Sequence, residues 1–307
     1  MSAVLDIATT IIVFGVAYAM LLFIISVGLS ITMGLMGFVN LAHGAFAMAG
    51  GYVTVTVVLR LLDMGQESSF WSWINDNGLG YLLALIIAFV VVAALGVVME
   101  RLLYRWVFGR PELDQVLFTI GLVFISVFAV TDIWGPDPQN IQLPQILRGD
   151  FDLGFKRIPI YRAFMIIVGG LIVLALFYGL ERTRVGAQVR AAVDNRRMAE
   201  SCGIPTSRLF TIIFALGSGM AALGGGLGIQ ILGGLKPVFA FEYLVIFLIV
   251  VAVGGLGNIR GTFFAALLLG IVDFAGKYFL PEGGGFFIYG ITFIVLLWRP
   301  QGLFGKA

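Results

Sequence analysis

The sequence predicts an all-α, polytopic membrane protein with about eight or nine transmembrane helices. Of its 307 residues, 60% are hydrophobic and only 12% are charged, whereas about a quarter of the residues of a typical soluble domain are charged. Apolar runs recur at close to the roughly 20 residues that a helix needs to cross a bilayer. A membrane β-barrel would instead show short segments of alternating polarity. We therefore expect a single transmembrane domain over residues 1–307.

The first apolar run is longer than one crossing requires, and it ends at an interruption. It covers residues 7–36 and contains no small-residue cleavage site, so it predicts a retained helix rather than a signal peptide. The interruption reads GFVNLAHG over residues 37–44. A broken or re-entrant segment there would change the number of crossings without moving the later loops.

The remaining apolar runs predict eight further spans. They cover residues 45–62, 81–99, 113–134, 160–180, 209–232, 241–253, 262–280 and 286–298. The sixth span of the chain is rich in glycine, and its Gly224 and Gly228 form a GxxxG pair. Such pairs let two helix backbones approach closely in lipid, so we expect this span to be tightly packed.

The charges of the loops indicate which ends of the spans face the cytoplasm. With the amino terminus outside, twelve of the nineteen lysines and arginines fall in inside loops and four in outside loops, as the positive-inside rule requires. The segment 63–80 contains three acidic residues, no basic residue, and Trp71 and Trp73. We expect it to be an outside loop whose aromatic side chains anchor it at the interface with membrane lipid.

The most polar segment of the chain lies at about residues 182–208. It holds six arginines and only two acidic residues, which predicts a cytoplasmic loop. Val185, Val189 and Val193 recur at four-residue spacing and predict one short surface helix, which Gly203 would end and Pro205 would keep from continuing. A mere connection between spans need not be this long, so the loop favours contact with a cytoplasmic motor protein.

Few polar residues fall inside the predicted spans. Asn40 and His43, next to Gly44, would share a face if they were helical, and polar groups at membrane depth indicate a pore or hinge unless they are satisfied locally. The alternative is a helix-breaking motif whose side chains bind exposed backbone groups. Asp273 and Lys277 are four residues apart, and we interpret them as a structural ion pair along one helix.

Several classes of chemistry find no support in the sequence. It contains no P-loop, GxSxG or HExxH motif and no paired carboxylates. His43 is the only histidine and Cys202 the only cysteine, which excludes a histidine cluster, a CxxC metal site and an internal disulfide. No basic stripe with interleaved aromatic residues suggests nucleic acid. The glycine-rich string at residues 254–261 lacks the Lys-Ser/Thr ending of a phosphate cradle, and we interpret it as a tight turn. We expect no catalysis, no metal site and no nucleic-acid binding.

Four segments together resemble the branched-chain amino-acid ABC permease family, and in particular its LivH-type subunit. They are GFVNLAHG at 37–44, RRMAESCGIPTSR at 196–208, GGLGNIRG at 254–261 and RPQGLFG at 299–305. Each is weak alone, but their order and spacing make the joint match specific over most of the chain. Asn258 and Arg260 stand where the family more often has Ser and Pro.

The resemblance implies the permease subunit of an ATP-driven importer in the bacterial inner membrane. It implies four kinds of partner: a LivM-type second permease, two cytoplasmic ATP-binding subunits that hold ATP and Mg, and a periplasmic substrate-binding protein. The arginine-rich loop then corresponds to the segment that docks on the ATPase. The coupling residues that this implies are Asp194, Asn195, Arg197, Ala199, Glu200 and Gly203. Asn40, His43 and Gly44 become candidates for the translocation path. Members of the family are associated with branched-chain and other amino acids and with urea or short amides.

Two other functions compete with this one. A stand-alone channel for a small neutral solute, such as urea or an amide, would also need many glycines and few buried charges, but it leaves the long arginine-rich loop without a role. A membrane scaffold or enzyme subunit is the other alternative, and the absence of any catalytic constellation argues against the enzyme.

Overall fold

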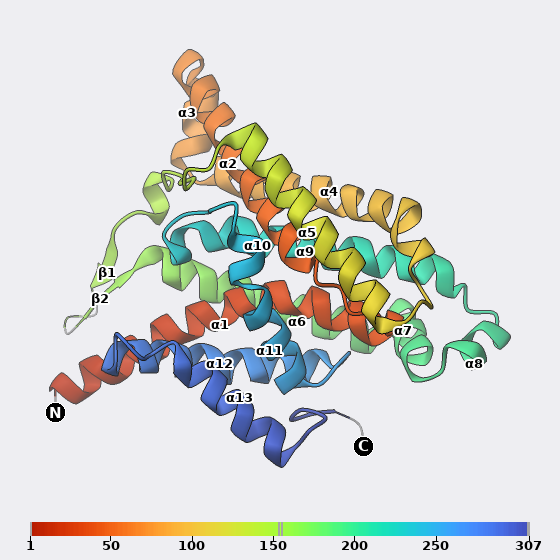
Figure 1. The fold of residues 1–307 in the computed structure, drawn as a ribbon. Coiled ribbons are helices and arrows are strands. Elements are labelled where there is room, and N and C mark those ends of the chain that lie inside the picture. The colour runs from red at the N-terminus through yellow and green to blue at the C-terminus, as the bar shows by residue number, and fades with distance from the viewer. Residues whose placement is uncertain (1, 153, 155, 306–307) are drawn as a thin grey trace.

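The computed structural model describes residues 2–152, 154 and 156–305, which form a bundle of helices (Figure 1). Seven of these helices are long and apolar enough to cross a membrane. They are α1 (Ser2–Met36), α2 (His43–Glu67), α4 (Leu79–Leu102), α5 (Glu112–Trp134), α6 (Ile160–Arg182), α9 (Thr206–Leu232) and α12 (Ile259–Phe279). The all-α, polytopic fold predicted from the sequence is confirmed.

Shorter apolar helices occupy the two remaining predicted spans. They are α10 (Phe239–Glu242) with α11 (Leu244–Gly254), and α13 (Phe286–Trp298). At about 1.5 Å per residue, α13 is roughly 20 Å long, which is less than the about 30 Å hydrocarbon core of a bilayer. The number of transmembrane spans therefore depends on whether these short helices are taken as crossings, and eight or nine spans fit the structure.

The centre of the bundle is built around α9. It packs against α1, α2 and α4, and α1 packs in turn along α12. Glycines of α9 make these contacts close: a Cβ atom at Gly224 would lie 2.1 Å from Cγ1 of Ile25, and one at Gly225 would lie 1.8 Å from the carbonyl oxygen of Ala47. The close packing predicted for this span is therefore present, because a side chain at either position would clash with the neighbouring helix.

The two ends of the bundle carry different kinds of structure. The short helices α7 (Arg184–Asp194) and α8 (Arg196–Ser201) lie at one end, on the right in Figure 1. The amino terminus and a hairpin of β1 (Asp150–Asp152) and β2 (Arg157–Pro159) lie at the opposite end. Lys156 Nζ lies 3.1 Å from Asp6 Oδ1, which ties the start of α1 to the hairpin.

Helix α3 (Ser69–Asp76) projects from the end of α2 (Figure 1). Its Phe70 and Trp73 side chains are more than half exposed. Aromatic side chains are enriched at the lipid–water interface, so this arrangement suits the anchoring role predicted for residues 63–80. Two single turns of 3₁₀ helix, η1 (Tyr104–Trp106) and η2 (Gln145–Leu147), complete the regular structure.

The carboxyl-terminal segment closes over the glycine-rich turn between α11 and α12. The Leu303 amide donates to the carbonyl oxygen of Val253 at 2.7 Å, and Asn258 Nδ2 donates to that of Phe304 at 2.8 Å. Asn258 also caps α12, since its Oδ1 accepts from the Gly261 amide. The tight turn predicted here is present, and Asn258, one of the departures from the family pattern, has a structural role in it.

Candidate functional site

An interruption separates α1 from α2. Helix α1 ends at Met36, and Gly37 follows with φ +59°, a left-handed conformation that glycine adopts without steric strain. Residues 37–42 are not helical. Within them, the Asn40 side chain is buried, and its Oδ1 accepts from the Ala42 amide at 3.1 Å and from the Tyr104 hydroxyl at 3.0 Å. Asn40 thereby provides an acceptor for the Ala42 amide, which lies outside any helix.

His43 begins α2 well inside the bundle. Its Nε2 lies 2.9 Å from the carbonyl oxygen of Ile25, eleven residues before the end of α1 at Met36. That offset corresponds to about 16 Å along the helix axis. The non-helical segment 37–42 therefore runs back into the protein, as irregular backbone can do at membrane depth only where protein surrounds it.

A second break in the helices meets α2 at the same place. A Cβ atom at Gly44 would lie 2.6 Å from the carbonyl oxygen of Ala240, which belongs to the four-residue helix α10. The structure thus brings together Asn40, His43 and Gly44, but the first two side chains bind backbone or tyrosine groups, as the structural alternative described. Their part in a translocation path stays a prediction.

The arginine-rich loop contains two helices, and the expectation of a single helix is wrong. The chain breaks at Asn195, whose backbone is extended and whose Oδ1 accepts from the Met198 amide to cap α8. Asparagine is a strong N-cap residue because its side chain competes for backbone donors. Of the three valines expected to form a stripe, only Val189 is buried.

The turn from α8 into α9 is held by several hydrogen bonds. Glu200 Oε1 accepts from Thr206 Oγ1 at 2.6 Å and from Arg196 Nε at 3.0 Å. These bonds, of which that from Thr206 is the stronger influence, lower the pKa of the Glu200 carboxyl. Gly203 has φ +80°, and the Ile204 amide donates to the carbonyl oxygen of Ala199 at 3.0 Å. Gly203 ends α8 as predicted.

The other predicted coupling residues lie around this turn. Ala199 is buried, whereas Asp194, Asn195, Arg197 and Glu200 are exposed. Arg196, between them, places its guanidinium carbon 4.6 Å from the ring centre of Phe210 on α9. The loop therefore combines an exposed polar rim with a fixed connection to the central helix of the bundle.

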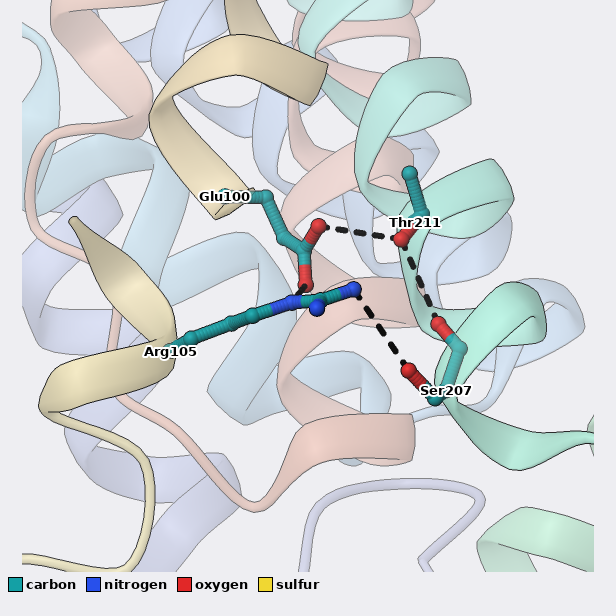
Figure 2. A network of polar contacts seen from close by, with 4 residues as sticks. All are labelled: Glu100, Arg105, Ser207 and Thr211. Carbon is teal, nitrogen blue, oxygen red and sulfur yellow. Dashed lines mark hydrogen bonds and ion pairs between the residues drawn. The ribbon is translucent and has the colours of Figure 1, made fainter. Parts of the chain in front are cut away.

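A polar network at the same end of the bundle joins α4, η1 and α9 (Figure 2). Glu100 is buried at the end of α4, with 2% of its side chain exposed. Its Oε1 accepts from Arg105 Nε at 3.2 Å, and its Oε2 accepts from Thr211 Oγ1 at 2.9 Å. Arg105 Nη2 also reaches Ser207 Oγ at 3.5 Å. Sequence reasoning missed Glu100, although an acidic residue amid the arginines that follow the third span was a visible signal.

A pocket of about 510 Å³ opens beside this network. Its walls come from the interrupted segment after α1, from the end of α4 with the following residues 105–109, from the start of α5, and from α8 and α9. The lining residues are Gly37, Phe38, Glu100, Arg105, Phe108, Gly109, Gln115, Arg196, Ser207 and Phe210. The pocket thus lies between the interrupted segment and the arginine-rich loop.

Comparison with known proteins identifies the family. The family described as "Branched-chain amino acid transport system / permease component" matches residues 11–296. The chain belongs to this family. It is 28% identical to the high-affinity branched-chain amino acid transport system permease protein LivH of Escherichia coli K12 over 92% of this chain and 91% of that protein. No solved structure matches the chain.

Two further relatives place the permease within the family. The chain is 27% identical to the high-affinity branched-chain amino acid transport system permease protein BraD of Pseudomonas aeruginosa over 92% of this chain and 91% of that protein. It is 25% identical to the permease protein LivM of Escherichia coli K12 over 92% of this chain and 68% of that protein. The resemblance to LivH-type permeases predicted from the four motifs is confirmed.

Proposed function

We propose that this permease is one of two membrane-spanning subunits of an ATP-driven importer of branched-chain amino acids. The observation that carries the proposal is the rigid connection of an exposed, arginine-rich loop to the central helix of a membrane bundle. That connection is what a subunit driven by an external motor requires. The named relatives are branched-chain amino acid permeases, which supports the substrate class.

The contacts suggest how motion would pass from the loop into the bundle. The bond from Thr206 to Glu200 joins the end of α8 to the start of α9, and the Arg196 guanidinium lies over Phe210 one turn further along. Helix α9 packs against α1, α2 and α4. A displacement of α8 would therefore move α9 and, through it, the interrupted segment that contains Asn40 and His43.

The proposal includes four kinds of partner. A LivM-type permease would supply the other half of the translocation path, two cytoplasmic ATPases would bind α7 and α8 and hold ATP with Mg, and a periplasmic binding protein would deliver the substrate. The location would be the bacterial inner membrane. In this arrangement the chain has no catalytic step of its own, since ATP is hydrolysed by the partner subunits.

Co-purification of the tagged chain from its native membrane tests the proposal. We expect mass spectrometry to find a second permease and ATPases with the unaltered chain. Glu200→Arg should lose the ATPases, because it reverses the charge at the α8–α9 turn, whereas the matched variant Glu112→Arg at the start of α5 should keep them. Reconstituted with its partners and a leucine-loaded binding protein, the chain should take up leucine only with ATP.

Two results would contradict the proposal. One is recovery of the chain alone in a detergent that preserves known complexes of this kind. The other is solute flux through liposomes that contain only this chain, which would favour the channel.

A further inference from the structure

The pocket between the interrupted segment and α8 contains both kinds of charge. Glu100 contributes a carboxylate, and Arg105 and Arg196 contribute guanidinium groups. The Arg105 side chain is 46% exposed and that of Arg196 is 55% exposed. Both are therefore accessible to a ligand, while the carboxylate of Glu100 is held at the inner wall.

The guanidinium of Arg105 is positioned to bind an anion. It carries five N–H donors, and among the described residues it gives one hydrogen bond to Glu100 and one to Ser207 (Figure 2). A guanidinium group matches the geometry of a carboxylate through two parallel hydrogen bonds. The remaining donors of Arg105 can therefore receive the carboxylate of a small ligand.

Gln115 supplies a second polar feature of the wall. The residue is 5% exposed, and its Nε2 donates to the carbonyl oxygen of Arg110 at 2.9 Å. Its Oε1 is buried and accepts no hydrogen bond from the described residues. A buried acceptor without a donor is unfavourable, because it has lost its hydrogen bonds to water and gained none in the protein. Glu100 and Gln115 both line the pocket, so an ammonium group bound there would offer donors to their oxygen atoms.

Three aromatic rings complete the lining, namely those of Phe38, Phe108 and Phe210. The rings of Phe38 and Phe108 meet edge to face, with centres 5.5 Å apart. A volume of about 510 Å³ lies within the range of pockets that hold small organic ligands. The pocket thus offers a guanidinium group, two acceptors and an apolar surface within one small space.

We propose that this pocket binds a zwitterionic amino acid with an apolar side chain, from the same end of the bundle as α7 and α8. The α-carboxylate lies against Arg105, the ammonium group against Glu100 and Gln115, and the side chain against the phenylalanine rings. The proposal rests on the proposed function for its choice of branched-chain amino acids, and it adds a site for the imported substrate on the cytoplasmic side of the permease.

The site would also be in contact with the coupling loop. Arg196 lines the pocket and pairs with Glu200 at 3.0 Å. A carboxylate bound at Arg105 would place a further negative charge in the pocket that Arg196 lines, and this charge would compete with Glu200 for the Arg196 guanidinium group. Amino acid that accumulates in the cytoplasm would therefore act on the α8–α9 turn directly.

Equilibrium binding of radiolabelled leucine to the purified permease–ATPase complex, with no binding protein present, tests the proposal. We expect saturable binding of one leucine for each copy of this chain. Leucinol, which lacks the carboxylate, and 4-methylpentanoate, which lacks the ammonium group, should not displace it. Phe108→Asp, which places a further negative charge in the apolar part of the lining, should abolish binding.

A matched pair of arginine variants tests whether the positive charge of Arg105 binds the carboxylate of leucine. Arg105→Gln should weaken leucine binding about tenfold or more, the effect of losing a charge-assisted hydrogen bond. Arg101→Gln changes the same charge four residues away, outside the lining, and should leave binding unchanged. Folding of each variant is checked by size-exclusion chromatography and by retention of the ATPases.

Uptake by the complete importer separates this proposal from the proposed function. If leucine is taken up with ATP but the complex shows no saturable leucine binding, or binding that Phe108→Asp leaves unchanged, the pocket is not an amino-acid site and the proposed function stands. If no branched-chain amino acid is taken up, the proposed function fails, and the assignment of leucine to this pocket fails with it.

Discussion

The side chain of Glu100 is only 2% exposed, and its two polar partners come from different elements. Arg105 belongs to η1 and Thr211 to α9. A buried charge is tolerated only where hydrogen bonds replace its hydration. The network in Figure 2 therefore fixes the end of α4 against the start of α9, close to the coupling loop.

Removing Arg105 should destabilise the protein more than removing its neighbour Arg101. Arg105→Ala leaves the Glu100 carboxylate with Thr211 alone, and we expect a loss of about 1–3 kcal/mol in the free energy of unfolding. The loss falls toward the lower end because the arginine is partly exposed and screened by water. Adding Glu100→Gln should recover part of it, because the amide carries no charge. Thermal unfolding in detergent measures the stability of the two single variants and of the double variant. Equal losses for Arg105→Ala and Arg101→Ala would contradict the prediction.

Glu200 should make the α8–α9 turn sensitive to acid. Its carboxyl pKa is lowered below the ordinary value of 4.5 by the hydrogen bonds from Thr206 and Arg196. A lowered pKa means that these contacts stabilise the turn at every pH above 4.5, and that the stabilisation is lost as the pH falls through the lowered pKa. The protection factor for hydrogen exchange of the Ile204 amide, which corrects for the intrinsic pH dependence of exchange, should fall in that acid range. In Glu200→Gln, which cannot titrate, the exchange should show no such step.

At the level of elements, the arginine-rich loop shows where sequence patterns stop being informative. The end of its second helix at Gly203 was predictable from the positions of glycine and proline, which are local properties, and its cytoplasmic location remains a prediction from the charge count. The break at Asn195 was missed because all three valines precede it and lie in α7, so their spacing carries no information about where that helix ends. Since an N-cap asparagine can also sit in the middle of a helix, only the bond from Met198 to its side chain decides between one helix and two.

The turn at Gly203 should tolerate asparagine better than alanine. The φ of +80° is strained for any residue with a Cβ atom, and no neighbouring atom lies within 4 Å of a Cβ built there. Gly203→Ala should therefore cost about 1–2 kcal/mol through backbone strain alone, while asparagine adopts this conformation more readily. We expect Gly203→Ala to lower ATP-driven uptake with normal membrane insertion, and Gly203→Asn to retain most of it. Equal uptake by both variants and the unaltered chain would remove Gly203 from the coupling residues.

For the whole molecule, the sequence sufficed for the fold class, the apolar segments and the family, because each depends on short segments read independently. The contacts that build the site join residues far apart in the chain. Tyr104 meets Asn40 across 64 residues, and Thr211 meets Glu100 across 111. No local pattern encodes such pairs. The pocket could not be predicted from the sequence for the same reason, because five separate segments line it.

The packing of the bundle should depend on Gly225 far more than on Gly121. A Cβ at Gly225 would lie 1.8 Å from the Ala47 carbonyl oxygen, whereas one at Gly121 on α5 meets nothing within 4 Å. Gly225→Val should force α2 and α9 apart and abolish accumulation of the folded protein. Gly121→Val should have little effect. Fluorescence-detected size exclusion of tagged variants makes the comparison, and a monodisperse Gly225→Val protein would show that the two helices can shift without loss of the fold.

The non-helical segment at residues 37–42 also bears on how the nascent chain enters the membrane. Asn40 cannot receive its bond from Tyr104 until 64 further residues have been synthesised. Until then this backbone, which belongs at membrane depth, lacks its protein surroundings, and lipid offers no substitute. A hairpin of α1 and α2 alone therefore lacks the bond that Tyr104 gives to Asn40, and the segment gains this bond only once α4 and η1 have been synthesised.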